Sequence, residues 1–288
     1  MQPYKNAGGE TPSYHQRRTR TREIPSPECF LDDEILHGPP SYSKSDFSKP
    51  KLRKCRFDVA DINWDISSPI DGGFDGYSWK VFFGRNGPYV LKMFWDVEHT
   101  EQYFAPEREC QNAAILAMME ESVCQATVKS TKIHLNPNPK SKEEASANFY
   151  AFTEESLHLQ SQNAQVFGIS SIPRMRVCYG WAKVGRDHVP LNSWPRKLKF
   201  GKKDRYMSVE QEHIAIIYEY IEDKTNDQGT VEKVATFLWQ AGFTFTNYPE
   251  KGNWRDGVLV DLSEVVHVHG YGWKEKLFKQ RDSTTLLA

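Results

Sequence analysis

Lys92 stands in the middle of an otherwise apolar and aromatic run that extends from Tyr89 to Trp95. The β-branched and aromatic residues of this run are typical of a β-strand. A lysine inside such a strand needs a partner, because burying an unpaired ammonium group costs several kcal/mol. Two interpretations are open: Lys92 protects an exposed edge strand against aggregation, or it pairs with a phosphate or a carboxylate in a binding site.

Two histidines near the C-terminus could bind a metal. His267 and His269 are two positions apart, so on a strand their side chains would share one face. Protein zinc sites use at least three side-chain ligands, and no third ligand is clustered nearby in the sequence. The chain also has no Gly-x-Ser-x-Gly elbow for a nucleophilic serine. These patterns favour packing roles for both histidines.

Positive charge is clustered in residues 196–205, which hold six basic side chains and one acidic side chain. Phe200 lies within this segment, and Trp194 and Tyr206 flank it. Cations mixed with aromatic side chains are typical of nucleic-acid-binding surfaces. A solvated loop is the alternative interpretation.

The composition indicates a soluble intracellular protein. The chain has 288 residues, 39% of them hydrophobic, and a mean hydropathy of −0.66, so we expect part of its length to be disordered. Its net charge of −1 argues against general nucleic-acid binding by the whole surface. The five cysteines are odd in number and form no Cys-x-x-Cys pair, which favours reduced thiols. No apolar run is long enough for a membrane span or a signal peptide.

Residues 1–55 are rich in Pro, Ser, Gly and charge, and we expect them to form a disordered tail. The tail contains four arginines, at positions 17, 18, 20 and 22, followed by Ser26-Pro27. This pattern fits a nuclear-import signal, a contact with an anionic partner or a phosphorylation-tuned segment, and a solubilising tail is the alternative.

From Phe57 onward the patterns predict alternating strands and helices. The predicted strands are Trp79–Phe83, Tyr89–Trp95, Pro173–Val184, His213–Tyr220 and Val258–Leu262, and the predicted helices are Glu101–Glu121 and Thr230–Ala241. Asn86-Gly87 between the first two strands is a strong hairpin signal. We therefore expect one domain over residues 56–275, with a C-terminal tail over 276–288. Insertions are expected at 125–170, with a short helix in 149–160, and at 190–212.

The order of these parts resembles the N-lobe and hinge of a protein kinase, followed by the beginning of its C-lobe. The resemblance implies that Lys92 contacts nucleotide phosphates and that Glu109, with Glu107 as the alternative, is its partner on the helix. It implies that Glu219 lies in a hinge whose backbone holds adenine, and that Asp261 holds Mg²⁺. Gly73 and Gly76, just before the first strand, take the place of the glycine-rich loop.

The sequence departs from the kinase pattern where catalysis is performed. No His-Arg-Asp precedes Asn253, and the position of the catalytic base is Tyr248, which cannot accept a hydroxyl proton at neutral pH. Leu262-Ser263, rather than Phe-Gly, follows Asp261. The chain ends 27 residues after Asp261, which is short for the rest of a kinase C-lobe. A catalytic kinase is therefore not expected.

Three segments carry a more specific likeness: Gly-Pro-Tyr-Val-Leu-Lys-Met-Phe-Trp at 87–95, Tyr-Phe-Ala-Pro-Glu-Arg-Glu-Cys-Gln-Asn-Ala-Ala at 103–114, and Asn-Trp-Arg-Asp-Gly-Val-Leu-Val-Asp-Leu-Ser at 253–263. They resemble the fungal kinetochore Sim-four complex subunit family, also called the Fta-two family. The likeness covers roughly residues 60–275. It implies a filamentous-fungal protein in the nucleus, at the inner kinetochore, with other protein subunits as partners.

These observations predict an α+β fold: a protein-kinase-like N-lobe of one antiparallel sheet plus one helix, a reduced C-lobe and a disordered N-terminal tail. The predicted function is that of a non-catalytic, kinase-like (pseudokinase) interaction module. Lys92 would pair with Glu109 and Asp261 or with a nucleotide bound without turnover, and the basic segments would contact partner subunits or DNA. The alternative is an active ATP- and Mg²⁺-dependent kinase with an atypical catalytic loop, in which Asp256 or Asp261 is the base or metal ligand.

Overall fold

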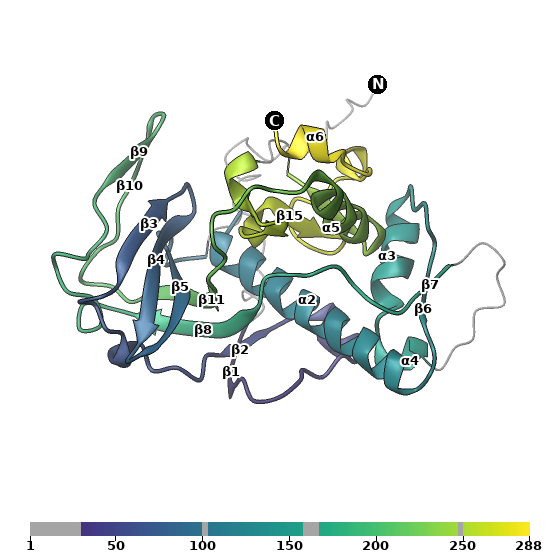
Figure 1. The fold of residues 1–288 in the computed structure, drawn as a ribbon, viewed down its shortest axis with the longest axis horizontal. Coiled ribbons are helices and arrows are strands. Elements are labelled where there is room, and N and C mark those ends of the chain that lie inside the picture. The colour runs from purple at the N-terminus through teal and green to yellow at the C-terminus, as the bar shows by residue number, and fades with distance from the viewer. Residues whose placement is uncertain (1–29, 100–102, 158–166, 247–249) are drawn as a thin grey trace, which may run out of the picture.

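A seven-stranded, mostly antiparallel sheet forms one part of this mixed α+β protein (Figure 1). The computed structural model describes residues 30–99, 103–157, 167–246 and 250–288. In spatial order the strands are β1 (Leu31–Ile35), β2 (Leu52–Lys54), β8 (Cys178–Val184), β11 (His213–Glu219), β5 (Asn86–Phe94), β4 (Gly76–Phe83) and β3 (Ser68–Gly72). The pairs β1–β2 and β2–β8 are parallel and the other neighbours are antiparallel.

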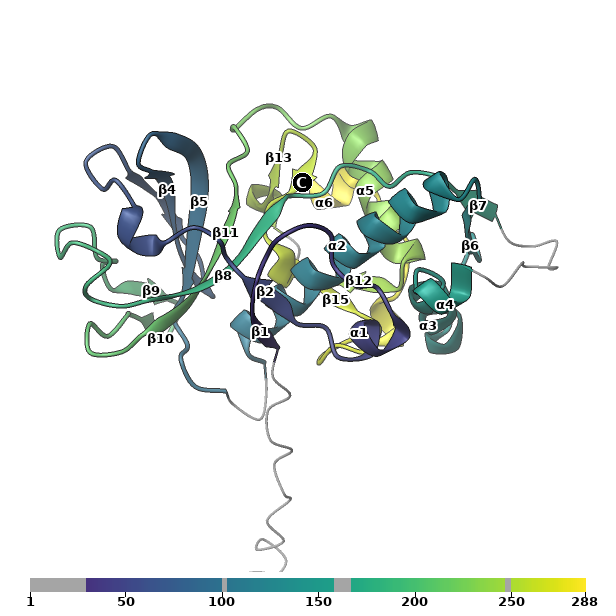
Figure 2. The ribbon, with the colours of Figure 1, turned by 90° about the horizontal axis from the view of Figure 1, so that it is seen from below.

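Six α-helices occur in the described residues: α1 (Lys44–Ser48), α2 (Ala105–Val128), α3 (Lys142–Tyr150), α4 (Glu154–Leu157), α5 (Gln228–Gln240) and α6 (Ser283–Leu286). The long helix α2 runs from the sheet towards α3 and α4, with α5 and α6 nearby (Figures 1 and 2). Pro106 lies in its first turn, where the missing N–H leaves no hydrogen bond unmade. In the described residues, no helix combines the length and apolar character required to span a membrane.

Four two-stranded sheets complete the strands. They pair β6 (Ile133–Leu135) with β7 (Phe167–Ile169), β9 (Leu198–Phe200) with β10 (Lys203–Arg205), β12 (Phe243–Phe245) with β15 (Val265–His267), and β13 (Trp254–Arg255) with β14 (Val258–Leu259). Four short 3₁₀ turns lie at Val59–Asp61, Lys251–Asn253, Leu262–Glu264 and Glu275–Leu277.

The large sheet separates two layers of the core, and strand β5 contributes to both because alternate side chains point to opposite faces of a sheet. Val90 and Phe94 pack in the cluster that contains the buried face of α2. Leu91 and Met93 pack in the cluster on the other face of the sheet, with Trp79. Lys92 shares its strand face with Val90 and Phe94, so it points to the α2 side.

The tail predicted over residues 1–55 is too long. Residues 30–55 are ordered and supply β1, α1 and β2, while residues 1–29 lie outside the described part of the chain. Phe47 and Leu52 are almost fully buried and anchor this segment in the core. A capping box at Ser43 and Asp46 begins α1. A few buried apolar side chains therefore suffice to order a segment that is otherwise polar.

The described residues of the predicted insertion, 125–157 and 167–170, do not form a polar insertion. The predicted helix Glu101–Glu121 begins later and continues to Val128, and β6, α3, α4 and β7 follow it. Phe149 and Phe152 are fully buried, and Phe149 packs edge-on against Phe47 with ring centroids 5.2 Å apart. This segment is part of the core beside α2.

Further boundaries differ from the prediction, among them the start of the strand predicted over Pro173–Val184, which begins at Cys178. Residues 190–212 contain the β9–β10 hairpin, and Arg205 and Met207 in this region are buried. The C-terminal region 276–288 packs on α5 through α6, with Phe278 and Leu286 buried. The predicted strand Val258–Leu262 ends at Leu259 and is followed by a 3₁₀ turn.

Candidate functional site

Lys92 lies on an interior strand. Strand β5 is hydrogen-bonded to β4 on one side and to β11 on the other, and Lys92 is opposite Ser78 and Ile216. Only 7% of its surface is exposed. The edge-strand interpretation is therefore wrong, because both edges of this strand are already paired.

Two carboxylates bind the Lys92 ammonium group. Its Nζ lies 2.6 Å from Glu109 Oε2 and 2.9 Å from Asp261 Oδ1. Glu109 is on the second turn of α2 and is fully buried, and its Oε1 accepts a hydrogen bond of 3.0 Å from the Tyr218 hydroxyl. This cluster of Lys92, Glu109 and Asp261 joins the sheet, α2 and the segment after β14.

Glu107, the alternative partner, points elsewhere. Its Oε2 lies 2.9 Å from His99 Nε2, and its Oε1 accepts a hydrogen bond from Gln111. Residues 107 and 109 are two positions apart on a helix and so face different directions. The structure therefore selects Glu109.

Asp261 is held in place by the turn that follows it. Its Oδ1 accepts hydrogen bonds from the Ser263 amide at 2.9 Å and the Ser263 hydroxyl at 2.6 Å, in addition to the Lys92 contact. Within the described ranges no hydrogen bond reaches Asp261 Oδ2. Asn112, fully buried on α2, donates to the carbonyls of Leu262 and Val265 and fixes this turn against the helix. Ser263 and Asn112 were not among the predicted site residues.

The protonation of the cluster follows from burial and charge. Burial alone would lower the pKa of Lys92, but Asp261 and Glu109 outweigh it and raise the pKa above its ordinary value. Burial raises the pKa of Glu109 to about 7, although Lys92 acts in the opposite direction. For Asp261 the effect of burial is outweighed by Lys92 and by the Ser263 hydrogen bonds, which lower its pKa. Lys92 is therefore charged at neutral pH, and Asp261 is its ionised partner there.

The cluster lies at a cavity of about 400 Å³. Lys92, Asp261 and Asn253 line it, together with the apolar side chains of Ile70, Val90, Ile221 and Val260. Further charged groups on its wall are Asp71, Asp75, Arg108, Arg176, Glu250, Arg255 and Glu264. The cavity thus offers both charges and a small apolar surface to a ligand.

Gly73 and Gly76 lie in a turn that lines this cavity. The Gly73 amide donates to the Gly76 carbonyl over 2.9 Å, and Phe74 and Asp75 occupy the tip between them. A Cβ atom on Gly76 would lie 2.4 Å from the Met93 carbonyl oxygen, so the backbone approach to β5 requires glycine there. A Cβ atom on Gly73 would meet nothing within 4 Å.

Asp75, which sequence analysis missed, reaches back from this turn towards α2. Its Oδ2 accepts a hydrogen bond of 2.5 Å from the Tyr103 hydroxyl, and the Arg108 guanidinium lies 4.0 Å from the centre of the Tyr103 ring. The buried Oδ1 of Asp75 has no hydrogen-bond partner among the described residues. Asp75 and Arg108 thereby connect this turn with α2. Arg108 also donates to the Ser263 carbonyl, which connects α2 with the segment after Asp261.

Glu219 does not place its carboxylate in the cavity. That carboxylate pairs with Arg174 and accepts a hydrogen bond from the Val177 amide. The Glu219 amide donates to the Val177 carbonyl over 2.9 Å, and the Glu219 carbonyl accepts from Arg176 Nε over 3.2 Å. Both backbone groups of Glu219, one residue of the predicted hinge, are therefore engaged within the protein.

Arg176 is the most consequential residue that the sequence did not indicate. It is 9% exposed, its guanidinium lies 4.4 Å from the centre of the Tyr218 ring, and its Nη1 donates to the Val260 carbonyl. It therefore ties the end of β11 to the residue before Asp261. A single arginine ahead of a strand carries no pattern that reveals this role.

His267 and His269 lie on β15 and just after it. Burial lowers the pKa of His267 to about 3, so its ring is neutral, and it stacks on Phe149. The His269 ring packs against Tyr150, and its Nε2 lies 3.2 Å from Ser146 Oγ. No group of three His, Cys, Asp or Glu side chains that could hold a metal occurs in the described residues.

The chain matches no family model, and comparisons with curated proteins and with solved structures also find no match. The fold and the site therefore define the class of protein by themselves. It is a mixed α+β protein in which a buried lysine and two carboxylates join the large sheet, α2 and the segment after β14 beside a cavity.

Proposed function

We propose that this chain is a kinase-like interaction module that transfers no phosphate. The observation that carries the proposal is the double contact of Lys92 with Glu109 and Asp261 inside one buried cluster. The order of parts supports it: the lysine is on an interior strand, the glutamate is on the next helix, and the short β13–β14 hairpin separates Asn253 from Asp261. The kinase resemblance predicts these positions for the groups that hold phosphates and Mg²⁺.

Positions 248 and 256, which the sequence compares with a kinase base, support a non-catalytic role. Tyr248 occupies the expected position of the base in the sequence and lies outside the described residues. Asp256, the alternative base, is exposed in the tight turn between β13 and β14, where its Oδ2 is 4.0 Å from Lys224 Nζ. It does not line the cavity, so it cannot take a proton from a hydroxyl group held there.

Nucleotide binding would require changes in this site. Lys92 already donates to two carboxylates, so only one of its three N–H groups is left for a phosphate. Adenine would have to displace Arg176 and Val177 from the Glu219 backbone. Lys92, Asp261 and Asn253 are the residues that would hold Mg-ATP if it binds. We propose that the cluster instead stabilises the fold of a module whose activity is binding to other proteins.

We further propose membership of the fungal kinetochore Sim-four complex subunit family, and with it a nuclear, inner-kinetochore location and partner subunits. The support is the sequence likeness of segments 87–95, 103–114 and 253–263. These three segments, which are far apart in the chain, supply Lys92, Glu109 and Asp261 and so meet at one cluster.

An active kinase is the second candidate, because the Lys92–Glu109 pair is formed and Asp261 Oδ2 faces no partner in the described residues. Thermal unfolding with and without Mg-ATP separates the two candidates. We expect no shift for the wild type, for Lys92→Met, or for the surface control Lys183→Met. A shift that only Lys92→Met abolishes, together with ATP turnover by the wild type, would favour the active kinase and overturn the proposal.

A further inference from the structure

The β9–β10 hairpin, with the residues just before it, carries a dense group of basic side chains. It projects from the end of the molecule opposite α3 and α4 (Figures 1 and 2). Arg196, Lys197, Lys199, Lys202 and Lys203 are all exposed on or beside it. Asp204 is the single carboxylate of residues 196–205. The hairpin is thus strongly positive, although the whole protein carries a net charge of −1.

Most of this charge is not neutralised within the protein. Lys197 Nζ pairs with Asp204 Oδ2 at 2.7 Å, and Lys203 Nζ lies 5.2 Å from the centre of the Phe74 ring. Arg196, Lys199 and Lys202 form no side-chain hydrogen bond or ion pair with any described residue. Three cations are therefore available to an external anion.

The hairpin is held in place by contacts with Asp96 and Phe74. Arg205 is 5% exposed, its Nη1 lies 2.7 Å from Asp96 Oδ1, and its guanidinium lies 4.5 Å from the centre of the Phe74 ring. Phe200 packs edge-on against the same ring, with centroids 6.1 Å apart. The free cations are thus presented on an ordered element, which lowers the entropy that binding costs.

We propose that the β9–β10 hairpin binds the phosphate backbone of a nucleic-acid duplex. The major groove of B-DNA, about 12 Å wide, admits a two-stranded β-ribbon. Nucleic-acid interfaces are polar and strongly positive, whereas lysine is depleted at protein–protein interfaces. The lysine-rich surface of this hairpin therefore favours a nucleic acid over an acidic protein. This inference does not depend on the kinase-like proposal.

The salt dependence of binding follows from the three free cations. Each phosphate neutralised contributes about −0.9 to the slope of log K against log salt concentration, so we expect a slope of about −3 with a B-DNA duplex. Fluorescence anisotropy of a labelled duplex of about 20 base pairs, titrated with the full chain at several salt concentrations, measures this slope.

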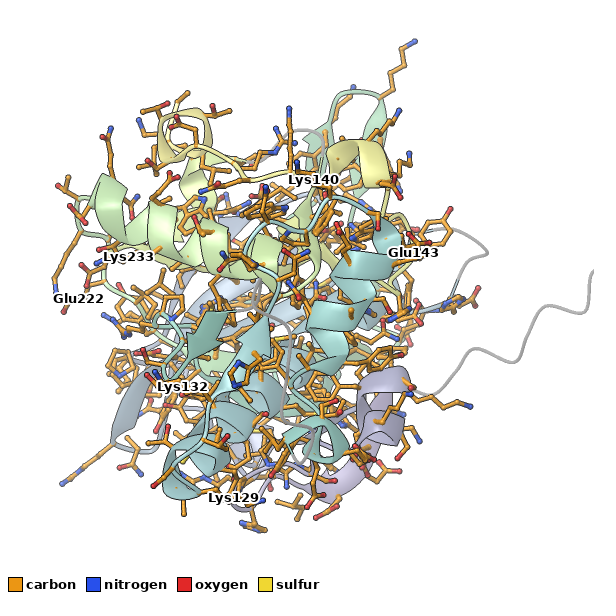
Figure 3. The ribbon with its side chains drawn as sticks, turned by 90° about the vertical axis from the view of Figure 1, so that its right-hand side faces the viewer. Lys129, Lys132, Lys140, Glu143, Glu222 and Lys233 are labelled. Carbon is orange, nitrogen blue, oxygen red and sulfur yellow. The ribbon has the colours of Figure 1, made fainter. Side chains whose placement is uncertain are left out.

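Matched charge-removal variants locate the surface. The hairpin variant carries Arg196→Gln, Lys199→Gln and Lys202→Gln, which remove no side-chain hydrogen bond or ion pair within the described residues. The control carries Lys129→Gln, Lys132→Gln and Lys140→Gln, three exposed lysines at the opposite end of the molecule (Figure 3). Both variants lose the same charge. We expect the hairpin variant to bind the duplex at least about tenfold more weakly at low salt, with a slope near zero, and the control to change less than about twofold.

Three results would overturn the proposal. One is failure of the wild type to bind the duplex at low salt, and another is an equal loss of binding in the two variants, which would indicate a general charge effect. The third is tight binding of a poly-glutamate peptide through the hairpin with no binding of the duplex, which would assign this surface to an acidic protein. Unfolding curves of both variants that match the wild type show that any loss is not due to misfolding.

Discussion

Glu264 is a second buried carboxylate beside the cavity, and it has no cation partner among the described residues. Its Oε1 accepts a hydrogen bond of 2.6 Å from the Glu250 amide, and its buried Oε2 has no hydrogen-bond partner there. Burial raises the pKa of Glu264 to about 7. Lys92 and Asp261 are therefore ionised at neutral pH, whereas the pKa values of Glu264 and Glu109 both lie near 7.

The titration of Glu264 predicts a pH dependence of stability. The pKa rises from 4.5 to about 7 on folding, so between these values the folded state binds more protons than the unfolded state. The neutral Glu264 carboxyl group therefore contributes to the free energy of unfolding at low pH, and this contribution is lost as the pH rises through about 7. Glu264→Gln removes this loss, and at pH 8 we expect it to raise the free energy of unfolding by about 1–3 kcal/mol. Urea unfolding of the wild type and the Glu264→Gln variant between pH 5 and about pH 8 measures this difference in the free energy of unfolding.

The exposed Glu120→Gln change on α2 is the control, because water solvates that side chain in both states. We expect it to leave the pH profile as in the wild type. A Glu264→Gln protein whose stability falls with pH as steeply as the wild type would show that Glu264 does not titrate as described.

At the scale of elements, the site depends on the close approach of the turn before β4 to the neighbouring strand β5. Gly76 has its carbonyl in the turn and its Cα against Met93, where a Cβ atom would lie 2.4 Å from a backbone oxygen. Backbone cannot move aside as a flexible side chain can. The strand pair would have to separate locally to admit a methyl group.

Gly76→Ala is therefore expected to destabilise the protein by at least about 2 kcal/mol, because it forces a backbone clash. Gly73→Ala, three residues away in the same turn, adds a methyl group in open space and is expected to change stability by less than about 0.5 kcal/mol. Thermal or urea unfolding of the two variants provides the comparison. Equal effects of the two substitutions would contradict the described approach of β4 and β5.

The elements that carry the cluster could be predicted from the sequence, and their connections only in part. The apolar run around Lys92, the helical spacing around Glu109 and the strand predicted over Val258–Leu262 are local patterns, and each corresponds to an element of the structure, although α2 ends seven residues later and β14 three residues earlier than predicted. Arg176 and Asn112 act over long sequence separations, on Val260 and on Leu262, so no local pattern signals them. The ordered segments 30–55 and 125–157 were missed because their buried residues are sparse and not periodic.

At the scale of the whole molecule, the N-terminal segment is part of the core. Residues 30–54 extend the large sheet at its β8 side through β2 and β1, and α1 lies against α3 and α4 (Figure 2). The Lys44 amide donates to the Glu155 carboxylate, and the Glu154 amide donates to the Tyr42 carbonyl. The segment thus bridges the sheet and the helices beyond α2.

Phe47→Ala tests this role, because Phe47 is fully buried and packs on Phe149. We expect a loss of about 3–5 kcal/mol in the free energy of unfolding, as for phenylalanines in other protein cores. Phe74→Ala, at a side chain that is 47% exposed, should cost about 1 kcal/mol or less. A loss below about 1 kcal/mol for Phe47→Ala would mean that α1 is not docked as described.

The buried cluster of Lys92, Glu109 and Asp261 underlies the proposed function, and a double-mutant cycle measures the interaction of its first two members. Lys92→Met, Glu109→Gln and the double variant are unfolded in urea, beside the same cycle for the exposed pair Lys183 and Glu212, whose charged atoms are 3.6 Å apart. We predict a coupling of about 2–3 kcal/mol for Lys92 and Glu109, and below about 1 kcal/mol for the surface pair. If the effects of Lys92→Met and Glu109→Gln on the free energy of unfolding are additive to within about 0.5 kcal/mol, this result would contradict the buried ion pair and the proposed function that rests on it.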